Sequence, residues 1–143
     1  MSSQKNHTVY LALGTNLGKK NQNLLIAISL IAERIGILSA ISSVYETAPW
    51  GFESNNSFLN QVVKVETDFL PLDLLKKTQE LEKEMGRTQK TNNSYQDRII
   101  DIDVILYDDL SFESKELTLP HPLYKKRDFV LKPLIEIAPH LKD

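Results

Sequence analysis

The chain has 143 residues, enough for one domain with a hydrophobic core, and it contains no cysteine, which excludes disulfides, thiol catalysis and zinc–thiolate sites. Its hydrophobic content of 41%, charged content of 25% and net charge of −2 indicate a globular protein with neither a nucleic-acid nor a membrane surface. Without a heptad pattern or a membrane-spanning apolar run, we expect one cytoplasmic domain over residues 1–143, monomeric by default.

The first half of the chain predicts a strand, a helix and two further strands. Residues 9–13 are apolar and β-favouring, and they are followed by a glycine-containing turn. Residues 21–35 have an apolar stripe at helical spacing. Residues 37–47 are β-rich and predict one continuous second strand, and residues 58–67 predict a third.

The second half predicts a helix, a strand and a C-terminal helix. Pro71 stands at the favoured first turn of a helix that ends at Gly86. Residues 98–107 predict the next strand, and residues 128–137 a helix interrupted at Pro133. Five side chains of the helix after Pro71 are expected to face inward: Leu74, Leu75, Thr78, Leu81 and Met85.

The order of these elements is β-α-β-β-α-β plus a C-terminal helical appendage. This order predicts an α+β, ferredoxin-like antiparallel sheet with two helices on one face. Enzymes, metal carriers and RNA-binding modules all have this fold, so the fold alone does not determine the function.

The strand at residues 98–107 carries two aspartates, Asp101 and Asp103, within an apolar run. Side chains alternate across a strand, so both carboxylates share one face, roughly 6–7 Å apart, and residues 100, 102, 104 and 106 line the other. Like charges at this spacing repel, and a bound Mg²⁺ with phosphate oxygens would relieve the repulsion. A solvated polar face on an edge strand explains the same pattern.

Several basic residues surround this motif in the sequence. Arg87 follows the second helix, Arg98 opens the aspartate strand, and His121, Lys125 and Arg127 cluster near the C-terminus. Arginine and lysine side chains suit phosphate oxygens, so the set fits a magnesium–polyphosphate substrate. Each residue alone also fits a solvated surface charge, and His121, between two prolines, fits a local structural hydrogen bond.

Two phenylalanines and an asparagine are candidates for binding a heterocycle. The amide of Asn60 offers a paired donor and acceptor, and Phe58 or Phe129 can stack on a ring. Burial in the core is the alternative for both phenylalanines. Gln79 and Glu82 lie one turn apart on the second helix, where they face either a ligand or solvent.

Six short motifs, taken in order, resemble the 6-hydroxymethyl-7,8-dihydropterin pyrophosphokinase family almost from end to end. Each motif is weak alone, but six in the right order are highly specific. In this sequence they read L-G-T-N-L-G at 13–18, Y-E-T-A-P-W-G at 45–51, F-L-N at 58–60, E-M-G-R at 84–87, D-R-I-I-D-I-D at 97–103, and L-P-H-P at 119–122 followed by Lys125, Arg127 and Phe129.

The resemblance implies transfer of diphosphate from ATP to the hydroxymethyl group of 6-hydroxymethyl-7,8-dihydropterin in folate biosynthesis, with release of AMP. Asp101 and Asp103 would bind two Mg²⁺ ions and act in catalysis with Arg87 and Arg98. The pterin would be held by Thr47, Ala48, Trp50, Phe58, Asn60 and Phe129. ATP would be held by Gln79, Glu82, Arg87, Arg98, Thr118, His121, Lys125 and Arg127.

Three positions depart from the family pattern. Tyr95 stands where a tryptophan is often found, Gln89 replaces a second basic residue, and Glu116 replaces an arginine that often contacts ATP. These departures bear on affinity and loop closure rather than on identity. The polar loops at residues 48–57 and 90–97 are candidate lids, because the reaction must exclude water.

Two other functions fit the residues alone. Paired aspartates on a ferredoxin-like sheet also suit a two-metal nucleotidyl transferase or nuclease, which the neutral charge balance disfavours. A non-catalytic sensing or metal-binding module is the second alternative, and it has no need for Arg98, His121 and Arg127 around the aspartates.

Overall fold

The computed structural model describes residues 6–48, 57–86 and 99–141. Its centre is an antiparallel sheet in the order β2-β4-β1-β5, with β3 pairing beside β2 along the same strand, β4. The strands of this sheet are β1 (His7–Thr15), β2 (Gly36–Ile41), β3 (Tyr45–Thr47), β4 (Phe58–Thr67) and β5 (Asp101–Tyr107).

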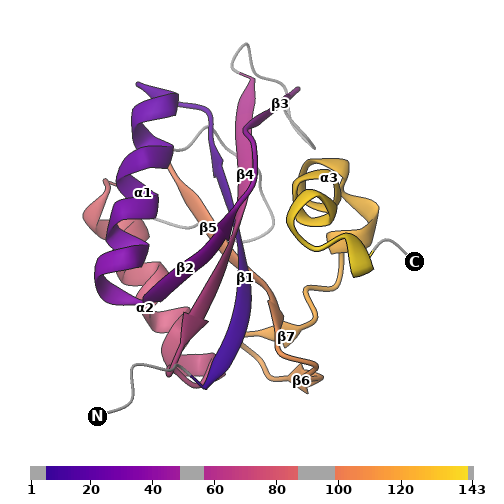
Figure 1. Ribbon diagram of the computed structural model, residues 1–143. Coiled ribbons are helices and arrows are strands. Elements are labelled where there is room, and N and C mark those ends of the chain that lie inside the picture. The colour runs from indigo at the N-terminus through magenta and orange to yellow at the C-terminus, as the bar shows by residue number, and fades with distance from the viewer. Residues whose placement is uncertain (1–5, 49–56, 87–98, 142–143) are drawn as a thin grey trace.

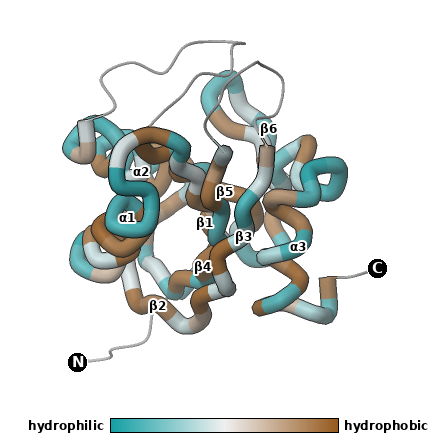
Figure 2. The backbone as a smooth tube through the Cα atoms, turned by 90° about the horizontal axis from the view of Figure 1, so that it is seen from above, coloured by the Kyte–Doolittle hydropathy of each residue, from teal (hydrophilic) through white to brown (hydrophobic). Residues whose placement is uncertain are grey.

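Helices cover both faces of the sheet (Figure 1). The helices α1 (Lys20–Arg34) and α2 (Pro71–Glu84) lie on one face, and α3 (Asp128–Ile137) lies on the other. Figure 2, seen from above, shows β1, β4 and β5 between the α1–α2 pair and α3. The predicted ferredoxin-like fold with a C-terminal helical appendage is confirmed.

Small elements complete the C-terminal part. A two-stranded ribbon, β6 (Phe112–Glu113) with β7 (Thr118–Leu119), follows β5, and the single-turn helices η1 (Tyr124–Lys126) and η2 (Pro139–Leu141) flank α3. Within the described ranges, no helix is both long enough and apolar enough to cross a membrane.

The alternation of side chains along β1 divides the core in two. Val9, Leu11 and Leu13 pack toward α1 and α2, and Tyr10 and Ala12 pack toward α3. Because every second residue of a strand points to the same face, one strand supplies both layers. The side of the sheet that faces α3 is the side that carries the candidate site.

Two sequence predictions about strands were wrong in detail. The single strand expected at 37–47 is divided into β2 and β3, because the Ser42 backbone and hydroxyl bind the Val62 backbone where the chain turns (N···O distances of 2.9 Å each). A register shift between β1 and β5 leaves Ile105 out of the pairing. Leu106 therefore packs with the α3-side cluster instead of sharing the face of Ile102 and Val104.

The C-terminal helix has the predicted bounds but no interruption. Pro133 lies inside α3 and is buried. It lacks one backbone donor, a loss that its packing offsets. The prediction of which α2 side chains face inward also needs a correction. Glu82, which was not among them, is buried together with Leu74, Thr78 and Leu81.

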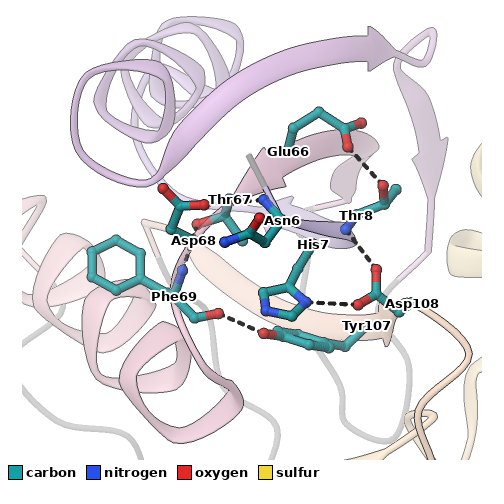
Figure 3. A network of polar contacts seen from close by, with 9 residues as sticks. All are labelled: Asn6, His7, Thr8, Glu66, Thr67, Asp68, Phe69, Tyr107 and Asp108. Atoms are coloured by element: carbon teal, nitrogen blue, oxygen red, sulfur yellow. Dashed lines mark hydrogen bonds and ion pairs between the residues drawn. The ribbon is translucent and has the colours of Figure 1, made fainter. Parts of the chain in front are cut away.

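A polar network closes the end of the sheet opposite to Gly14 (Figure 3). Asp108 accepts hydrogen bonds from the Thr8 amide at 2.7 Å and contacts His7 Nδ1 at 2.8 Å. The Tyr107 hydroxyl donates to the Phe69 carbonyl oxygen at 2.6 Å. These contacts join the start of β1, the end of β5 and the approach to α2.

Candidate active site

The floor of the candidate site is formed by three neighbouring strands near the end of β1. Gly14 of β1 pairs with Asn60 of β4 on one side and with Asp101 of β5 on the other. One step back, Ala12 pairs with Asp103. Directly paired residues point to the same face, and the central strand offers almost no side chain here. The amide and the two carboxylates therefore stand on either side of an open floor.

Helix α3 and strand β3 add the walls of this first pocket. Arg127 and Phe129 lie at the start of α3, with the Arg127 guanidinium carbon 5.8 Å from the centre of the Phe129 ring. The empty volume, including space open to solvent, is about 580 Å³. The pocket is lined by Ala12, Leu13, Gly14, Thr47, Ala48, Phe58, Asn60, Asp101, Asp103, Arg127, Phe129 and Val130.

Asn60 is buried, and its orientation is fixed by β3. Its Nδ2 donates to the Tyr45 carbonyl oxygen at 3.1 Å and to Thr47 Oγ1 at 2.8 Å. These two bonds use both protons of the amide nitrogen. The carbonyl oxygen Oδ1 lies over Gly14, so it is the atom that Asn60 can present to a donor on a ligand.

A second pocket lies along the outer side of β5, between α2 and the β6–β7 ribbon. Its empty volume, again including open solvent, is about 820 Å³. It is lined by Leu75, Gln79, Ile102, Asp103, Val104, Lys115, Glu116, Leu117, Thr118, His121 and Pro122. Asp103 lines both pockets, so the aspartate strand forms the boundary between them.

His121 is held in place by its own turn. Its backbone amide donates to the Ile105 carbonyl oxygen at 2.9 Å, and its Nδ1 accepts from the Leu123 amide at 3.2 Å. Since Nδ1 is an acceptor, the neutral ring carries its proton on Nε2. The local hydrogen bond considered from the sequence is thus present, in a residue that also lines the second pocket.

The residues predicted to bind ATP do not all line the same pocket. Gln79, Thr118 and His121 line the second pocket, and Arg127 lines the first. The Lys125 ammonium lies 5.9 Å from the centre of the Tyr124 ring, and Lys125 lines neither pocket.

Glu82 is buried, with only 3% of its surface exposed, and its Oε2 accepts the Ile102 amide at 2.7 Å. Ile102 stands between the two aspartates, and Glu82 lines neither pocket. No local sequence pattern marks this backbone contact, because it joins residues on two separate elements. Trp50, Arg87 and Arg98, together with Gln89 and Tyr95, lie outside the described residues.

Sequence reasoning also missed residues that the pockets contain. Lys115 lines the second pocket beside Glu116, and no motif marked it. Ala12 and Val130 line the first pocket through strand and helix geometry alone. Their small or aliphatic side chains give no chemical signal in the sequence.

The donor set suits a metal that is shared with a phosphate substrate. Asp101 and Asp103 are partly buried on one face, and two carboxylates with phosphate oxygens and water are a usual Mg²⁺ environment. Within the described parts of the chain, no group of three or more His, Cys, Asp or Glu side chains converges as in a protein-only metal cage. The residues present therefore fit a Mg²⁺ ion that is bound together with a phosphate-bearing substrate.

A polar contact outside both pockets joins α3 to the segment around β3. Glu136 accepts hydrogen bonds from the Tyr45 hydroxyl at 2.7 Å and from the Ser43 amide at 2.9 Å. The tyrosine hydrogen bond, followed by the Ser43 amide, lowers the pKa of Glu136 below its ordinary value. The same bond to Glu136 raises the pKa of Tyr45.

Comparison with known proteins gives consistent matches. The model of the 7,8-dihydro-6-hydroxymethylpterin-pyrophosphokinase (HPPK) family matches residues 10–139. A 2-amino-4-hydroxy-6-hydroxymethyldihydropteridine pyrophosphokinase of Porphyromonas gingivalis is 48% identical over 135 residues, which cover 93% of this chain and 92% of that protein. The Aquifex aeolicus protein of the same name is 45% identical and covers 94% of this chain and 82% of its own.

Solved structures agree on the fold. Wild-type HPPK-DHPS of Plasmodium falciparum, crystallised with pterin and p-hydroxybenzoate, matches 96% of this chain with a TM-score of 0.73 at 18% identity. This chain spans 41% of that larger chain. At this identity the likeness concerns the fold alone.

Proposed function

The chain belongs to the 7,8-dihydro-6-hydroxymethylpterin-pyrophosphokinase family, and we propose that its two pockets hold the two substrates of the family reaction on either side of the aspartate strand. That reaction is diphosphate transfer from ATP to 6-hydroxymethyl-7,8-dihydropterin in folate synthesis. The first pocket takes the pterin and the second takes ATP. The observation that carries this assignment is that Asp103 lines both pockets.

The first pocket has the chemistry that a pterin needs. Phe58 and Phe129 offer aromatic faces to a flat ring, and Asn60 Oδ1 accepts a hydrogen bond from an N–H at the edge of the ring. Thr47 and Ala48, with Trp50, complete the proposed pterin set. The pterin hydroxymethyl group then points toward the two carboxylates across the Gly14 floor.

The second pocket has groups suited to a nucleotide. Gln79 and Thr118 offer neutral hydrogen-bonding groups, and His121 donates through Nε2. Lys115 adds a cation to the set predicted from the sequence. Arg87, Arg98, Lys125 and Arg127 supply positive charge for the phosphates in this proposal, and Glu82 supports the strand at Ile102.

In the proposed reaction, the hydroxymethyl oxygen bonds to the β-phosphorus of ATP and loses its proton. The bond from that phosphorus to the oxygen bridging to the α-phosphate breaks, and AMP leaves with this oxygen. Two Mg²⁺ ions held by Asp101 and Asp103 would neutralise phosphate charge and lower the pKa of the attacking alcohol. Arg87 and Arg98 would meet the charge on the transferring group and on AMP.

Product analysis tests this function directly. The protein is incubated with MgCl₂, ATP and 6-hydroxymethyl-7,8-dihydropterin, and nucleotides are separated by ion-exchange chromatography. AMP that forms only when the pterin is present supports the proposal, and EDTA should abolish it. Formation of ADP, or formation of AMP without pterin, rejects it. Either result would instead favour a different phosphotransferase or a nuclease.

A further inference from the structure

One carboxylate on α3 holds the segment that leads into β3. Glu136 Oε1 accepts the Tyr45 hydroxyl at 2.7 Å, and Oε2 accepts the Ser43 amide at 2.9 Å and the Ser43 hydroxyl at 3.0 Å. We call Ser43, Tyr45 and Glu136 the α3–β3 clamp. These three residues lie outside both pockets.

Tyr45 connects the clamp to the pterin side of the site. Its hydroxyl donates to Glu136, and its backbone carbonyl oxygen accepts the Asn60 amide at 3.1 Å. Thr47, two residues later on the same strand, accepts the other Asn60 proton and lines the first pocket. One residue thus joins the Asn60 wall to α3.

Glu136 in turn lies on the helix that carries the opposite wall. Phe129 and Glu136 are seven residues apart on α3, so they share one side of the helix about two turns apart. Phe129 and Val130 line the first pocket. The clamp therefore ties the two walls together at a point remote from the ring-binding space.

We propose that the α3–β3 clamp consists of positioning residues that set the spacing between the Asn60 wall and the Phe129 wall, and so determine affinity for the flat bicyclic pterin. This inference rests on the proposed function, in which the first pocket takes the pterin. The Asn60 wall includes Phe58, two residues away on β4. A flat ring between the Phe58 and Phe129 faces needs them roughly 7–8 Å apart, given ordinary carbon–carbon contact distances.

The apolar contacts of α3 constrain this spacing less specifically than the clamp does. Val130, Leu134 and Ala138 pack in a cluster with Val62 and Ile105 of the sheet. Apolar burial is non-directional, so it keeps α3 against the sheet while allowing the helix to roll or slide. Hydrogen bonds are directional and restrict this movement. Three donors on one carboxylate give α3 a fixed orientation relative to β3.

The test compares Tyr45→Phe with Tyr107→Phe. Both variants lose one hydroxyl that makes one hydrogen bond, but the Tyr107 hydroxyl binds Phe69 at the opposite end of the sheet (Figure 3). Steady-state kinetics with each substrate varied in turn give the KM for the pterin and for ATP. Thermal unfolding of each variant measures the structural effect separately.

For Tyr45→Phe we expect the pterin KM to rise about 3- to 10-fold, the range that corresponds to one lost hydrogen bond, with the ATP KM changed less than about twofold. Tyr107→Phe should leave both KM values unchanged, although its melting temperature falls. Glu136→Ala should match or exceed Tyr45→Phe, and Glu136→Gln, which keeps an acceptor oxygen, should restore part of the affinity. The Tyr45→Phe/Glu136→Ala double variant should be no worse than Glu136→Ala alone.

Two results would contradict the proposed role of the α3–β3 clamp in pterin affinity. The first is a pterin KM in Tyr45→Phe and Glu136→Ala equal to that of Tyr107→Phe. The second is an equal rise in both KM values, which indicates general loosening. A failure of the proposed function is distinguishable, because the wild-type protein would then form no pterin-dependent AMP.

Discussion

At the scale of single residues, the aspartate pair brings two carboxylates close together on one strand. Asp101 and Asp103 share one face of β5, where their charges repel. Replacing either carboxylate by the isosteric amide removes this repulsion and keeps the side-chain shape. The fold should therefore tolerate the change while the proposed metal site does not.

We predict that Asp101→Asn and Asp103→Asn each lower kcat by a factor on the order of 10³, because metal-assisted stabilisation of the transition state is worth several kcal/mol. Each variant should still unfold cooperatively, which shows that the loss of turnover is not a loss of the fold. Pterin-dependent AMP formation and thermal unfolding provide the two readouts. Asp109→Asn, in the exposed turn after β5, is the control. Near-normal magnesium-dependent turnover in either variant would contradict the two-metal assignment.

Replacing glycine by alanine should have different effects at two positions, Gly36 and Gly14: on stability at the first and on pterin binding at the second. A methyl group on Gly36 would clash with the backbone carbonyl oxygen of Glu66, and the strand backbone cannot move aside cheaply. A methyl group on Gly14 would lie 3.6 Å from Asn60 Oδ1 and 3.8 Å from Phe58 Cδ1, which are ordinary contacts. It would, however, occupy the floor of the first pocket.

We therefore predict that Gly36→Ala destabilises the protein by about 2–3 kcal/mol, as overpacking does, and leaves the pterin KM of the folded fraction unchanged. Gly14→Ala should change the free energy of unfolding by less than about 1 kcal/mol and weaken pterin binding at least tenfold. Urea unfolding and pterin titration measure the two effects. A Gly36→Ala protein as stable as the wild type would contradict the close approach of Gly36 to Glu66. Unchanged pterin affinity in Gly14→Ala would contradict the place of Gly14 in the floor of the pterin pocket.

At the scale of elements, local sequence signals predicted most of the fold. The second half of β4 alternates apolar and polar residues and is rich in β-branched ones, and the structure gives the predicted bounds, 58–67. Pro71 at the first turn correctly marks the start of α2. These features depend on neighbours within one element, so periodicity and end signals are sufficient to place them.

Contacts between elements could not be predicted in the same way. The Ile105 bulge arises from pairing with β1, and the Glu82–Ile102 hydrogen bond joins α2 to β5. The sequence marked the chemistry of Asp101 and Asn60, and the family resemblance assigned them roles. No local pattern in the sequence indicated that Glu136 contacts Tyr45, since the two residues lie 91 positions apart.

The interaction between α3 and β3 should depend on pH. Hydrogen bonds from Tyr45 and Ser43 lower the pKa of Glu136 below the ordinary 4.5. A carboxyl group with a lowered pKa in the folded state stabilises that state above its unfolded pKa and loses this contribution as the pH falls through the folded value. Because Glu136 is exposed, we expect the effect to be small.

The wild type should therefore be more stable than Glu136→Gln at pH 7, and the difference should shrink below about pH 4.5 and vanish once the carboxyl group is protonated. Comparing the two proteins at each pH cancels other titrations, such as that of Glu84, whose pKa Arg34 lowers. Urea unfolding from pH 3 to pH 7 measures the difference. A gap that is constant over this range would exclude a contribution from the Glu136 charge.

At the scale of the whole molecule, the first pocket lies between the sheet and α3, on the face of the sheet that points away from α1 and α2. Its floor comes from β1, β4 and β5, and one wall comes from α3. Figure 2 shows these strands beside α3. A pterin in this pocket adds contacts across the junction between the sheet and α3. Binding should consequently stabilise the docking of α3 more than it stabilises the far end of the sheet.

Hydrogen exchange followed by mass spectrometry can measure this difference. A ligand present at a hundred times its Kd stabilises the bound form by about 2.7 kcal/mol, so amides of α3 that exchange through undocking should slow by about 100-fold. Amides near His7 and Tyr107, held by the network in Figure 3, need no such undocking and should change less. The comparison uses 6-hydroxymethyl-7,8-dihydropterin with MgCl₂ and a non-hydrolysable ATP analogue. Equal protection at both ends would mean that the ligand stabilises only the global fold, and that α3 does not act as a separately docked wall.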